Sequence, residues 1–338
     1  MTGVEDKVAV IGAGSWGTAF ANALSHKGLK VTLWARRPEL AAAIQESNEN
    51  PDYLPGLFLS PRLRGTSELE LALDGAAVVV MAVPSHGFRE VVMSAAKLAP
   101  PAAPFISLTK GLEPDSLRRM SEVIAEEVPA SWPERIGVLS GPNLAKEVAL
   151  AQPAASVVAC AHGGVADRLQ EFFMSPILRT YSASDVVGVE IGGVVKNVIA
   201  IATGIAEGIG FGDNTKATVV TRGLAEMTRL GMSLGADPMT FSGLAGVGDL
   251  ICTCMSGLSR NHHVGVELGK GRKIADILGE MSQVAEGVKS SKAVMALAEN
   301  YNVEMPISEG VYQVIHEGQE VSEMIGNLLR RVRQRERD

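Results

Sequence analysis

The chain has 338 residues, of which 46% are hydrophobic and 20% charged, and its formal net charge is −7 at pH 7. This composition is typical of a packed globular protein of about two domains and excludes an intrinsically disordered chain. Because duplex nucleic acid is bound through a basic surface, the acidic balance predicts no nucleic-acid partner.

The sequence also bears on where the protein acts. Its first residues lack the basic and long apolar regions of a secretory signal. Apolar runs at 76–84 and 194–202 are too short or too interrupted to cross a bilayer. Three cysteines, an odd number in a long chain, do not make a disulfide framework. We therefore expect a cytoplasmic protein with no membrane span.

The first half of the chain alternates between short apolar strands and helices. A strand at 7–11 leads through a glycine-rich turn into a helix that ends at Gly28. A second strand at 30–36 leads into a helix that Pro38 opens. Further strands are expected at 76–83, 105–108, 136–140, 155–160 and 177–181, with helices after Pro84 and at 114–127. This alternation predicts a parallel sheet covered by helices on both faces.

From about residue 186 the strand signals stop. The apolar segment 187–208 is rich in glycine and alanine, and the segments 215–231 and 281–300 are also helical in their spacing. We therefore predict an α/β domain over residues 1–187 and an all-helical domain over residues 188–338.

Gly12, Gly14 and Gly17 form a G-x-G-x-x-G pattern between the first strand and the first helix. In such a unit the first glycine permits the turn, the second lets a pyrophosphate approach the backbone, and the third lets the helix pack closely on the strand. The N-terminus of the helix then offers N–H groups to the phosphates. The pattern predicts dinucleotide binding in a Rossmann domain.

The end of the second strand indicates which dinucleotide is bound. An acidic residue there binds the ribose 2′-hydroxyl of NAD, whereas this chain has Arg36 and Arg37, and an arginine suits the 2′-phosphate of NADP. A pair of solvated surface arginines would give the same sequence. We expect NADP(H) to be favoured and NAD(H) to be possible.

Four charged residues lie where a ligand is expected. Lys110 directly follows a predicted strand, at the end that faces the ligand crevice of an open α/β sheet. Lys196 lies in an apolar helix, where an ammonium must reach solvent, pair, or lose its charge. Asp249 and Arg260 lie in a glycine-rich segment, and an arginine fork suits a phosphate. Two alternative interpretations remain: Lys110 as an ordinary solvated loop lysine, and Lys196 as a lysine whose ammonium reaches solvent along its own side chain.

Cysteine and histidine residues in the same segment raise the question of zinc. Cys252, Cys254, His262 and His263 supply suitable ligand atoms. No second cysteine pair completes a structural site, and the C-x-C pair lies on a predicted helix. We therefore predict no metal site.

Nine segments, in order along nearly the whole chain, resemble one family. They are GAGSWGTA, WARRPE, AVPSH, LTKGLE, LSGPN, GVVKNVIAIATG, TRGLAEM, GLAGVGDLI and SRN. The chain resembles NAD(P)-dependent glycerol-3-phosphate dehydrogenase of the bacterial type. The resemblance implies a Rossmann domain with a doubly wound, mostly parallel sheet, followed by an all-α domain of the 6-phosphogluconate dehydrogenase C-terminal-like type. It implies reversible reduction of dihydroxyacetone phosphate to sn-glycerol 3-phosphate, which supplies glycerophospholipid synthesis, and it allows a homodimer.

The resemblance also implies roles for individual residues. Lys196 matches the catalytic lysine, which accepts the proton in the oxidation direction. The substrate positions are Lys110, Gly141, Asn143, Lys196, Asp249, Ser259, Arg260 and Asn261. The cofactor positions are Gly12, Gly14, Ser15, Trp16, Gly17, Arg36, Arg37, Lys110, Ala145, Arg260, Val284 and Glu286. The sequence departs from the family pattern at Asn143, where serine or threonine is more familiar, at Leu144 and at His262–His263.

Two other functions remain open from the sequence. Another β-hydroxyacid dehydrogenase would share the layout and the helix lysine, but the segments LTKG and SRN would then have no purpose. A non-catalytic NADPH sensor would share the sheet, but it would not need the charged set of Lys110, Lys196, Asp249 and Arg260.

Overall fold

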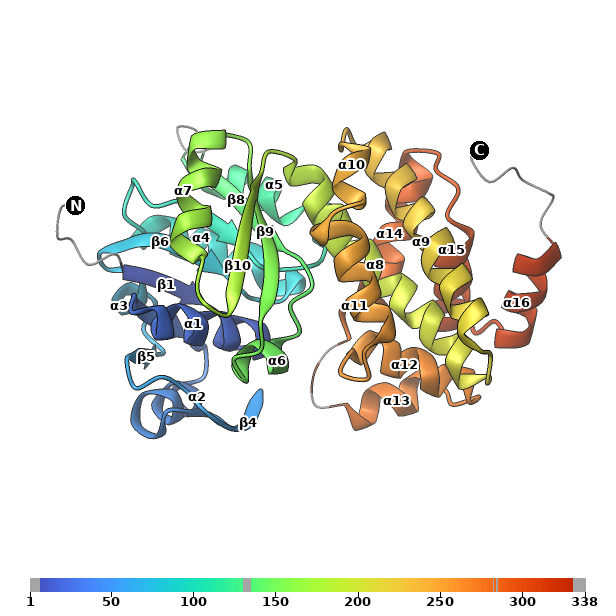
Figure 1. Cartoon of the computed structure of the whole chain (residues 1–338), viewed down its shortest axis with the longest axis horizontal. Coiled ribbons are helices and arrows are strands. Elements are labelled where there is room, and N and C mark those ends of the chain that lie inside the picture. Colours follow the sequence, from blue (N-terminus) through green and yellow to red (C-terminus); the bar gives the residue numbers. More distant parts are fainter. Residues whose placement is uncertain (1–6, 130–134, 282, 284, 331–338) are drawn as a thin grey trace. The chain divides into compact units, whose positions relative to one another are not determined.

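The computed structural model describes residues 7–129, 135–281, 283 and 285–330 (Figure 1). The chain forms two compact units. The first contains the residues up to Gly193 together with Ala236–Asp249, and the second contains Val194–Gly235 together with the residues from Leu250 onward. The predicted domain boundary between residues 187 and 188 stays a prediction.

The first unit is built on an eight-stranded sheet with the order β10-β9-β8-β7-β6-β1-β2-β5. Its strands are β1 Lys7–Ile11, β2 Lys30–Trp34, β5 Leu63–Thr66, β6 Ala76–Met81, β7 Phe105–Ser107, β8 Ile136–Ser140, β9 Ala154–Cys160 and β10 Leu178–Ala183. All neighbouring strands of this sheet are parallel except β8 and β9. The predicted doubly wound, mostly parallel sheet is therefore confirmed.

The antiparallel pair of β8 and β9 departs from the parallel pattern that the apolar strands predict. Ser140 pairs with Val157 in this register. The link at 141–153 contains only the five-residue helix α6 (Ala145–Ala149). A parallel connection needs a crossover, usually through a longer helix, so the chain instead turns back beside β8.

Helices cover both faces of the sheet. They are α1 Ser15–Lys27, α2 Pro38–Ala42, α3 Leu69–Leu73, α4 Phe88–Leu98, α5 Met120–Glu127 and α7 Gly163–Phe173. The first unit also contains α10 Pro238–Phe241 and the short helical segments η1 Ala43–Ser47, η2 Ser85–Gly87 and η4 Leu244–Gly248. Val8 of β1 belongs to the core that holds Phe20 of α1 and Phe173 of α7, while Ala9 belongs to the core that holds Val92 of α4. This alternation has the two-residue period of a strand, and burial on both faces explains why the strands are apolar throughout.

Several short elements were not predicted. A hairpin of β3 (Glu49–Asn50) and β4 (Leu54–Phe58) lies outside the main sheet. Its second strand reads LPGLF, in which proline and glycine are signals of a turn. The helix predicted at 114–127 begins only at Met120, because the preceding residues form a loop.

The second unit is helical, as predicted. Its helices are α8 Val186–Gly208, which begins in the first unit, α9 Asp213–Ser233, α11 Asp249–Met255, α12 Arg260–Gly269, α13 Ile274–Glu280, α14 Glu286–Asn300, α15 Pro306–Tyr312 and α16 Val321–Arg330, with the turn η5 Gln313–Glu317. The described residues from 186 to 330 contain no strand.

Helices α8 and α12 pack backbone to backbone at glycines. A Cβ atom on Gly204 would lie 2.1 Å from the carbonyl oxygen of His262, and one on Gly208 would lie 2.2 Å from the carbonyl oxygen of Val266. Gly265 of α12 meets a carbonyl oxygen of α8 in the same way. Any larger residue would push the helices apart, so these glycines fix α12 against α8.

By itself, the apolar run at 194–202 is too short or too interrupted to cross a bilayer. The structure places it in α8, which at 23 residues is long and apolar enough to do so. Of the apolar window in this helix, 89% is buried inside the protein. Its apolar character is therefore that of a core helix.

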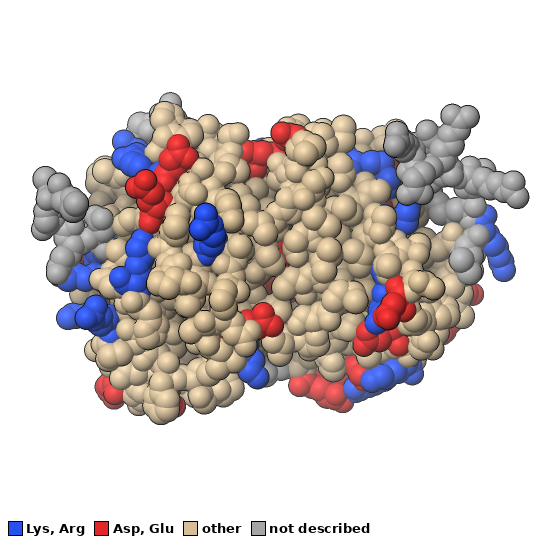
Figure 2. Space-filling model, in the orientation of Figure 1, with Lys and Arg blue, Asp and Glu red and all other residues tan. Residues whose placement is uncertain are grey.

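Charged side chains of both signs occur in small mixed groups on the face drawn in Figure 2. Arg272 shows the pattern, since it pairs with Glu267 and Glu280. Solvent screens exposed pairs of this kind, so they contribute little to stability.

One buried carboxyl group gives the second unit a pH-dependent stability. Glu226 of α9 is only 1% exposed, and it accepts hydrogen bonds from the backbone N–H of Ile307 at 2.6 Å and of Ser308 at 3.1 Å, at the start of α15. Burial raises the pKa of Glu226 from its ordinary 4.5 to about 7, although these bonds oppose the change. Between these two pH values the folded protein holds a proton that the unfolded chain has released.

Stability should therefore fall as the pH rises from about 4.5 to 7, by at most about 3 kcal/mol from this group. Glu226→Gln cannot ionise, so we expect its free energy of unfolding, relative to the wild type, to increase between pH 5 and pH 8. Denaturant titrations at four pH values measure this difference. Glu299→Gln, at an exposed position of α14, is the control. If the difference in free energy of unfolding between Glu226→Gln and the wild type did not vary with pH, the prediction would be contradicted.

Candidate functional site

The glycine-rich turn lies where the strand order of the sheet reverses. From β1 the chain passes to β2 and β5 on one side and then returns to β6 on the other, and ligands of open α/β sheets bind at such switch points. Gly12 follows β1 with a φ of +119°, and a Cβ there would lie 2.5 Å from the carbonyl oxygen of Ala82, after β6. A Cβ on Gly17 would lie 2.1 Å from the carbonyl oxygen of Gly12. Both positions therefore require glycine.

The start of α1 fits the phosphates and adjoining groups of a dinucleotide. Gly14 is the N-cap residue of α1, where no side chain caps the helix, and a Cβ on it would meet nothing within 4 Å. The indole Nε1 of Trp16 is buried and has no hydrogen-bond partner among the described residues. The hydroxyl of Ser15 donates to the carbonyl oxygen of Tyr53 at 3.1 Å. An open helix N-terminus favours anions, so these residues fit the predicted cofactor.

Asn50 supports this turn and was not predicted. It is fully buried in β3, and its amide donates to the carbonyl oxygen of Ala13 at 2.9 Å and to the hydroxyl of Thr18 at 2.8 Å. It thereby ties the turn to the first helix. The sequence contains no local signal for this role, because Asn50 lies more than thirty residues from both partners.

Arg36 and Arg37 follow β2 and are both exposed, but their surroundings differ. The guanidinium of Arg37 forms an ion pair with Asp52, and this hydrogen bond raises the pKa of Arg37. Arg36 has no hydrogen bond or ion pair with any residue that the structure describes. Arg36 can therefore meet a new anion without breaking a bond, whereas Arg37 must first release Asp52.

Lys110 brings together several predicted substrate residues of the first unit. Its ammonium donates to Asp249 Oδ2 at 2.7 Å, to Asn143 Oδ1 at 3.0 Å and to the carbonyl oxygen of Gly141 at 3.1 Å. Ser140, which was not predicted, donates to the same carboxylate oxygen of Asp249 at 3.3 Å. The Lys110 side chain is 16% exposed and that of Asp249 only 2%. We call these five residues the Lys110 cluster.

The backbone and a second bond hold two members of this cluster in place. Gly141 has a φ of +143°, and a Cβ there would lie 2.9 Å from the carbonyl oxygen of Ala155. The amide of Asn143 donates to the hydroxyl of Ser156 at 3.1 Å. The departure from the family pattern at Asn143 thus supplies an acceptor for Lys110 and a donor for β9 at once.

A second group, the Lys196 cluster, lies in the second unit. The ammonium of Lys196, which is 5% exposed, donates to the hydroxyl of Thr253 on α11 at 2.8 Å. The amide of Asn261 on α12 donates to Asn197 Oδ1 at 2.9 Å, and its oxygen accepts from the N–H of Gly287 at 2.9 Å. Thr253 and Asn197 were not predicted as site residues, although Asn197 adjoins Lys196 in the sequence.

The remaining predicted residues lie at the starts of helices. Ser259 is the N-cap residue of α12 and accepts from the N–H of His262 at 3.2 Å, and Arg260, which is exposed, is the first residue of that helix. Ala145 begins α6 and Glu286 begins α14. Val284 lies outside the described residues.

The cysteine and histidine segment gathers no ligand set. Cys252 and Cys254 lie on α11, and His262 lies 3.6 Å from Glu207. Among the residues that the structure describes, no three His, Cys, Asp or Glu side chains are grouped so that they could hold a metal ion.

A doubly wound sheet with a glycine-rich turn at its switch point, followed by a helical unit, defines a dinucleotide-binding protein of the Rossmann class. Residues 7–166 match the NAD-dependent glycerol-3-phosphate dehydrogenase N-terminus, and residues 185–326 match the C-terminus of the same family. The chain belongs to the NAD-dependent glycerol-3-phosphate dehydrogenase family.

Individual relatives agree with this assignment. The chain is 48% identical to a glycerol-3-phosphate dehydrogenase (NAD(P)+) of Citrifermentans bemidjiense over 96% of its own length and 97% of the relative. It is 50% identical to the enzyme of the same name from Streptomyces griseus over 98% of both chains. The crystal structure of glycerol-3-phosphate dehydrogenase from Coxiella burnetii superposes with a TM-score of 0.91 at 36% identity, over 97% of this chain and 99% of that one.

Proposed function

We propose that this protein catalyses the reversible reduction of dihydroxyacetone phosphate to sn-glycerol 3-phosphate with NAD(P)H, and thereby supplies glycerophospholipid synthesis. The observation that carries the proposal is the similarity, over nearly the whole chain, to relatives named glycerol-3-phosphate dehydrogenase (NAD(P)+). Neither alternative from the sequence, a different β-hydroxyacid dehydrogenase or a sensor, accounts for that similarity.

Lys196 is the proposed catalytic residue. A reduced nicotinamide, when bound, would supply the hydride that the ketone carbon accepts. Negative charge then develops on the carbonyl oxygen, and the Lys196 ammonium stabilises that oxygen and donates a proton to it. Thr253 accepts one N–H of the ammonium and so limits its rotation. In the oxidation direction Lys196 accepts the proton.

The other predicted substrate residues hold the phosphate and the carbon chain in this proposal. Arg260 begins α12 and is exposed, and a guanidinium at a helix N-terminus suits a phosphate. In the proposal, Lys110 and Asp249 bind the substrate close to its reacting carbon. Asp249 and Thr253 both lie on α11. The remaining substrate positions of the proposal are Gly141, Asn143, Ser259 and Asn261.

The proposal includes NADP(H) as the favoured cofactor and NAD(H) as a second one, a cytoplasmic location and a homodimer. The fit of Gly14 and Trp16 to a dinucleotide supports cofactor binding. The cofactor positions proposed beyond the glycine turn are Arg36, Arg37, Lys110, Ala145, Arg260, Val284 and Glu286.

The reaction is tested by mixing the purified protein with dihydroxyacetone phosphate and either NADPH or NADH, and by following the absorbance of the reduced nicotinamide. We expect rapid oxidation with the phosphorylated ketone and little with dihydroxyacetone, which lacks the phosphate. No oxidation by protein that binds NADPH would overturn the proposed substrate.

Cofactor preference is predicted to depend more on Arg36 than on Arg37, because Asp52 already engages the latter. We expect Arg36→Ala to raise KM for NADPH about tenfold, the effect of one charge-assisted contact of roughly 1.4 kcal/mol, and to leave KM for NADH nearly unchanged. Arg37→Ala is the matched control and should change both constants by less than about threefold. If Arg36→Ala and Arg37→Ala raised KM for NADPH equally, the distinction between the two arginines would be contradicted.

A further inference from the structure

The loop that carries Lys110 is held by side chains more than by regular structure. It covers residues 109–119, between β7 and α5. Within it, the N–H of Glu113 donates to the carbonyl oxygen of Arg118 at 2.9 Å, and Leu117 has a φ of +58°. A non-glycine residue in the left-handed region is strained, so contacts with neighbouring elements must maintain this shape.

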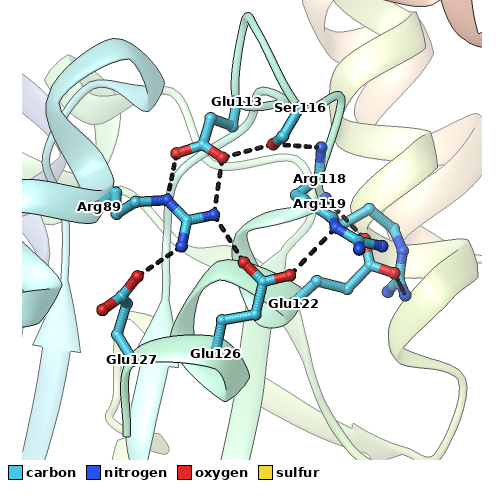
Figure 3. Close-up of polar contacts among 8 residues, drawn as sticks. All are labelled: Arg89, Glu113, Ser116, Arg118, Arg119, Glu122, Glu126 and Glu127. Carbon is cyan, nitrogen blue, oxygen red and sulfur yellow. Dashed lines mark hydrogen bonds and ion pairs between the residues drawn. The ribbon is translucent and has the colours of Figure 1, made fainter.

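Arg89 supplies the most extensive of these contacts (Figure 3). It lies on α4, and its Nε and Nη2 atoms donate to the two carboxylate oxygens of Glu113 at 2.8 Å each. Its remaining donors reach Glu126 at 2.7 Å and Glu127, both on α5. One guanidinium thus joins α4, the Lys110 loop and α5, and a two-pronged contact fixes direction as well as distance.

Burial and charge make this contact stronger than an exposed ion pair. The side chain of Glu113 is 16% exposed and that of Arg89 is 29% exposed. Hydrogen bonds from Arg89 lower the pKa of Glu113, so this carboxylate is ionised at neutral pH. Arg118 pairs with Glu126 at 3.1 Å. Without Arg89, Glu113, Glu126 and Glu127 would lose the cation that they share, and their repulsion would favour an opened loop.

The position of the contact in the chain connects it to Lys110. Glu113 lies three residues after Lys110, and Thr109, directly before it, donates from its hydroxyl to the carbonyl oxygen of Val83 at 2.7 Å. Lys110 is therefore anchored on both sides. A loop released at Glu113 would lose its tie to α4 on the C-terminal side of Lys110, which would let the ammonium of Lys110 move away from Asp249 more easily.

We propose that Arg89 is a positioning residue for Lys110, which it holds in the Lys110 cluster through Glu113. Arg89 does not touch the substrate in this proposal and acts only through the loop. The inference rests on the proposed function, in which Lys110 holds the substrate.

The test is a double-mutant cycle in the full-length enzyme. Arg89→Met keeps the length of the side chain but removes the two-pronged contact, and we expect kcat/KM for dihydroxyacetone phosphate to fall about tenfold, within the range of measured coupling between neighbouring residues. In a Lys110→Met background the same replacement should change kcat/KM by less than about twofold, because no ammonium remains to be positioned. A merely structural role would not depend on Lys110.

The possible results separate the two claims. A tenfold loss from Arg89→Met in both backgrounds, or no loss in either, would overturn the positioning role. Normal activity of Lys110→Met alone would instead overturn the proposed function of Lys110, and the inference would fall with it.

Three further variants keep the test informative. Arg118→Met removes a charge from the same network without touching the contact of Glu113 with Arg89, and it should leave kcat/KM within about twofold. If Arg89→Met does not fold, Glu113→Gln tests the same link from the other side and should show the same dependence on Lys110. Arg89→Lys, which keeps the charge but cannot make a two-pronged contact, should recover part of the lost activity.

Discussion

Replacement of Lys196 by methionine is expected to lower kcat for dihydroxyacetone phosphate reduction by at least about 100-fold, the usual contribution of a proton donor in the transition state. Methionine keeps an unbranched apolar side chain, which suits the buried surroundings of Lys196 on α8, but it offers no charge to the developing oxyanion. Steady-state kinetics measure the loss. Fluorescence titration with NADPH should give a dissociation constant within about threefold of the wild type, because the glycine turn is unchanged.

Thr253→Val tests the hydrogen bond that holds the Lys196 ammonium, and Lys292→Met is the matched control for this result. The first keeps the shape of the threonine but removes the acceptor of the Lys196 ammonium, and we expect about a tenfold loss in kcat. The second removes a lysine from an exposed position of α14 and should have no effect. A Lys196→Met enzyme with kcat close to the wild-type value would exclude Lys196 as the proton donor.

The parts of the fold that could be predicted from the sequence are those with a local physical cause. The apolar residues 7–11 must be buried, Gly12 has a positive φ of +119°, and a Cβ on Gly17 would overlap the carbonyl oxygen of Gly12. Gly28 ends α1 in the left-handed conformation, as its place after a helical run predicts. Each of these signals lies within a few residues of the element that it specifies.

The parts that escaped prediction depend on residues far apart in the chain. Asp249 is 139 residues from Lys110, and Thr253 is 57 residues from Lys196. A sequence can show that Lys110 lies at a strand end and that Lys196 lies in an apolar helix, but only the fold supplies the carboxylate and the hydroxyl that accept hydrogen bonds from their ammonium groups.

The same limit applies to charge. Arg36 and Arg37 are alike in the sequence, and only the hairpin that carries Asp52 distinguishes them. Arg89 has no recognisable motif, yet it has more charged partners than either. Because an ion pair depends on where the chain folds back, residue type alone does not separate an arginine that binds a ligand from one that binds the protein.

The glycines between α8 and α12 give the largest expected effect on stability. Gly204→Ala would place a Cβ 2.1 Å from the carbonyl oxygen of His262, and backbone atoms on both helices leave nothing flexible to move aside. We expect the free energy of unfolding to fall by about 2–3 kcal/mol, as for overpacked cores, in spite of the better helix propensity of alanine. Denaturant titration followed by circular dichroism measures the change.

Gly326→Ala is the matched control, since it makes the same replacement inside α16, where a Cβ would meet nothing within 4 Å. It should stabilise the protein by about 0.5–1 kcal/mol. Gly204→Ala should also raise KM for the phosphorylated substrate, because α12 begins at Arg260 and must shift to admit the methyl group. If the two alanine variants were equally stable, α8 and α12 would not be in backbone contact, and Arg260 would have to be positioned by some other part of the second unit.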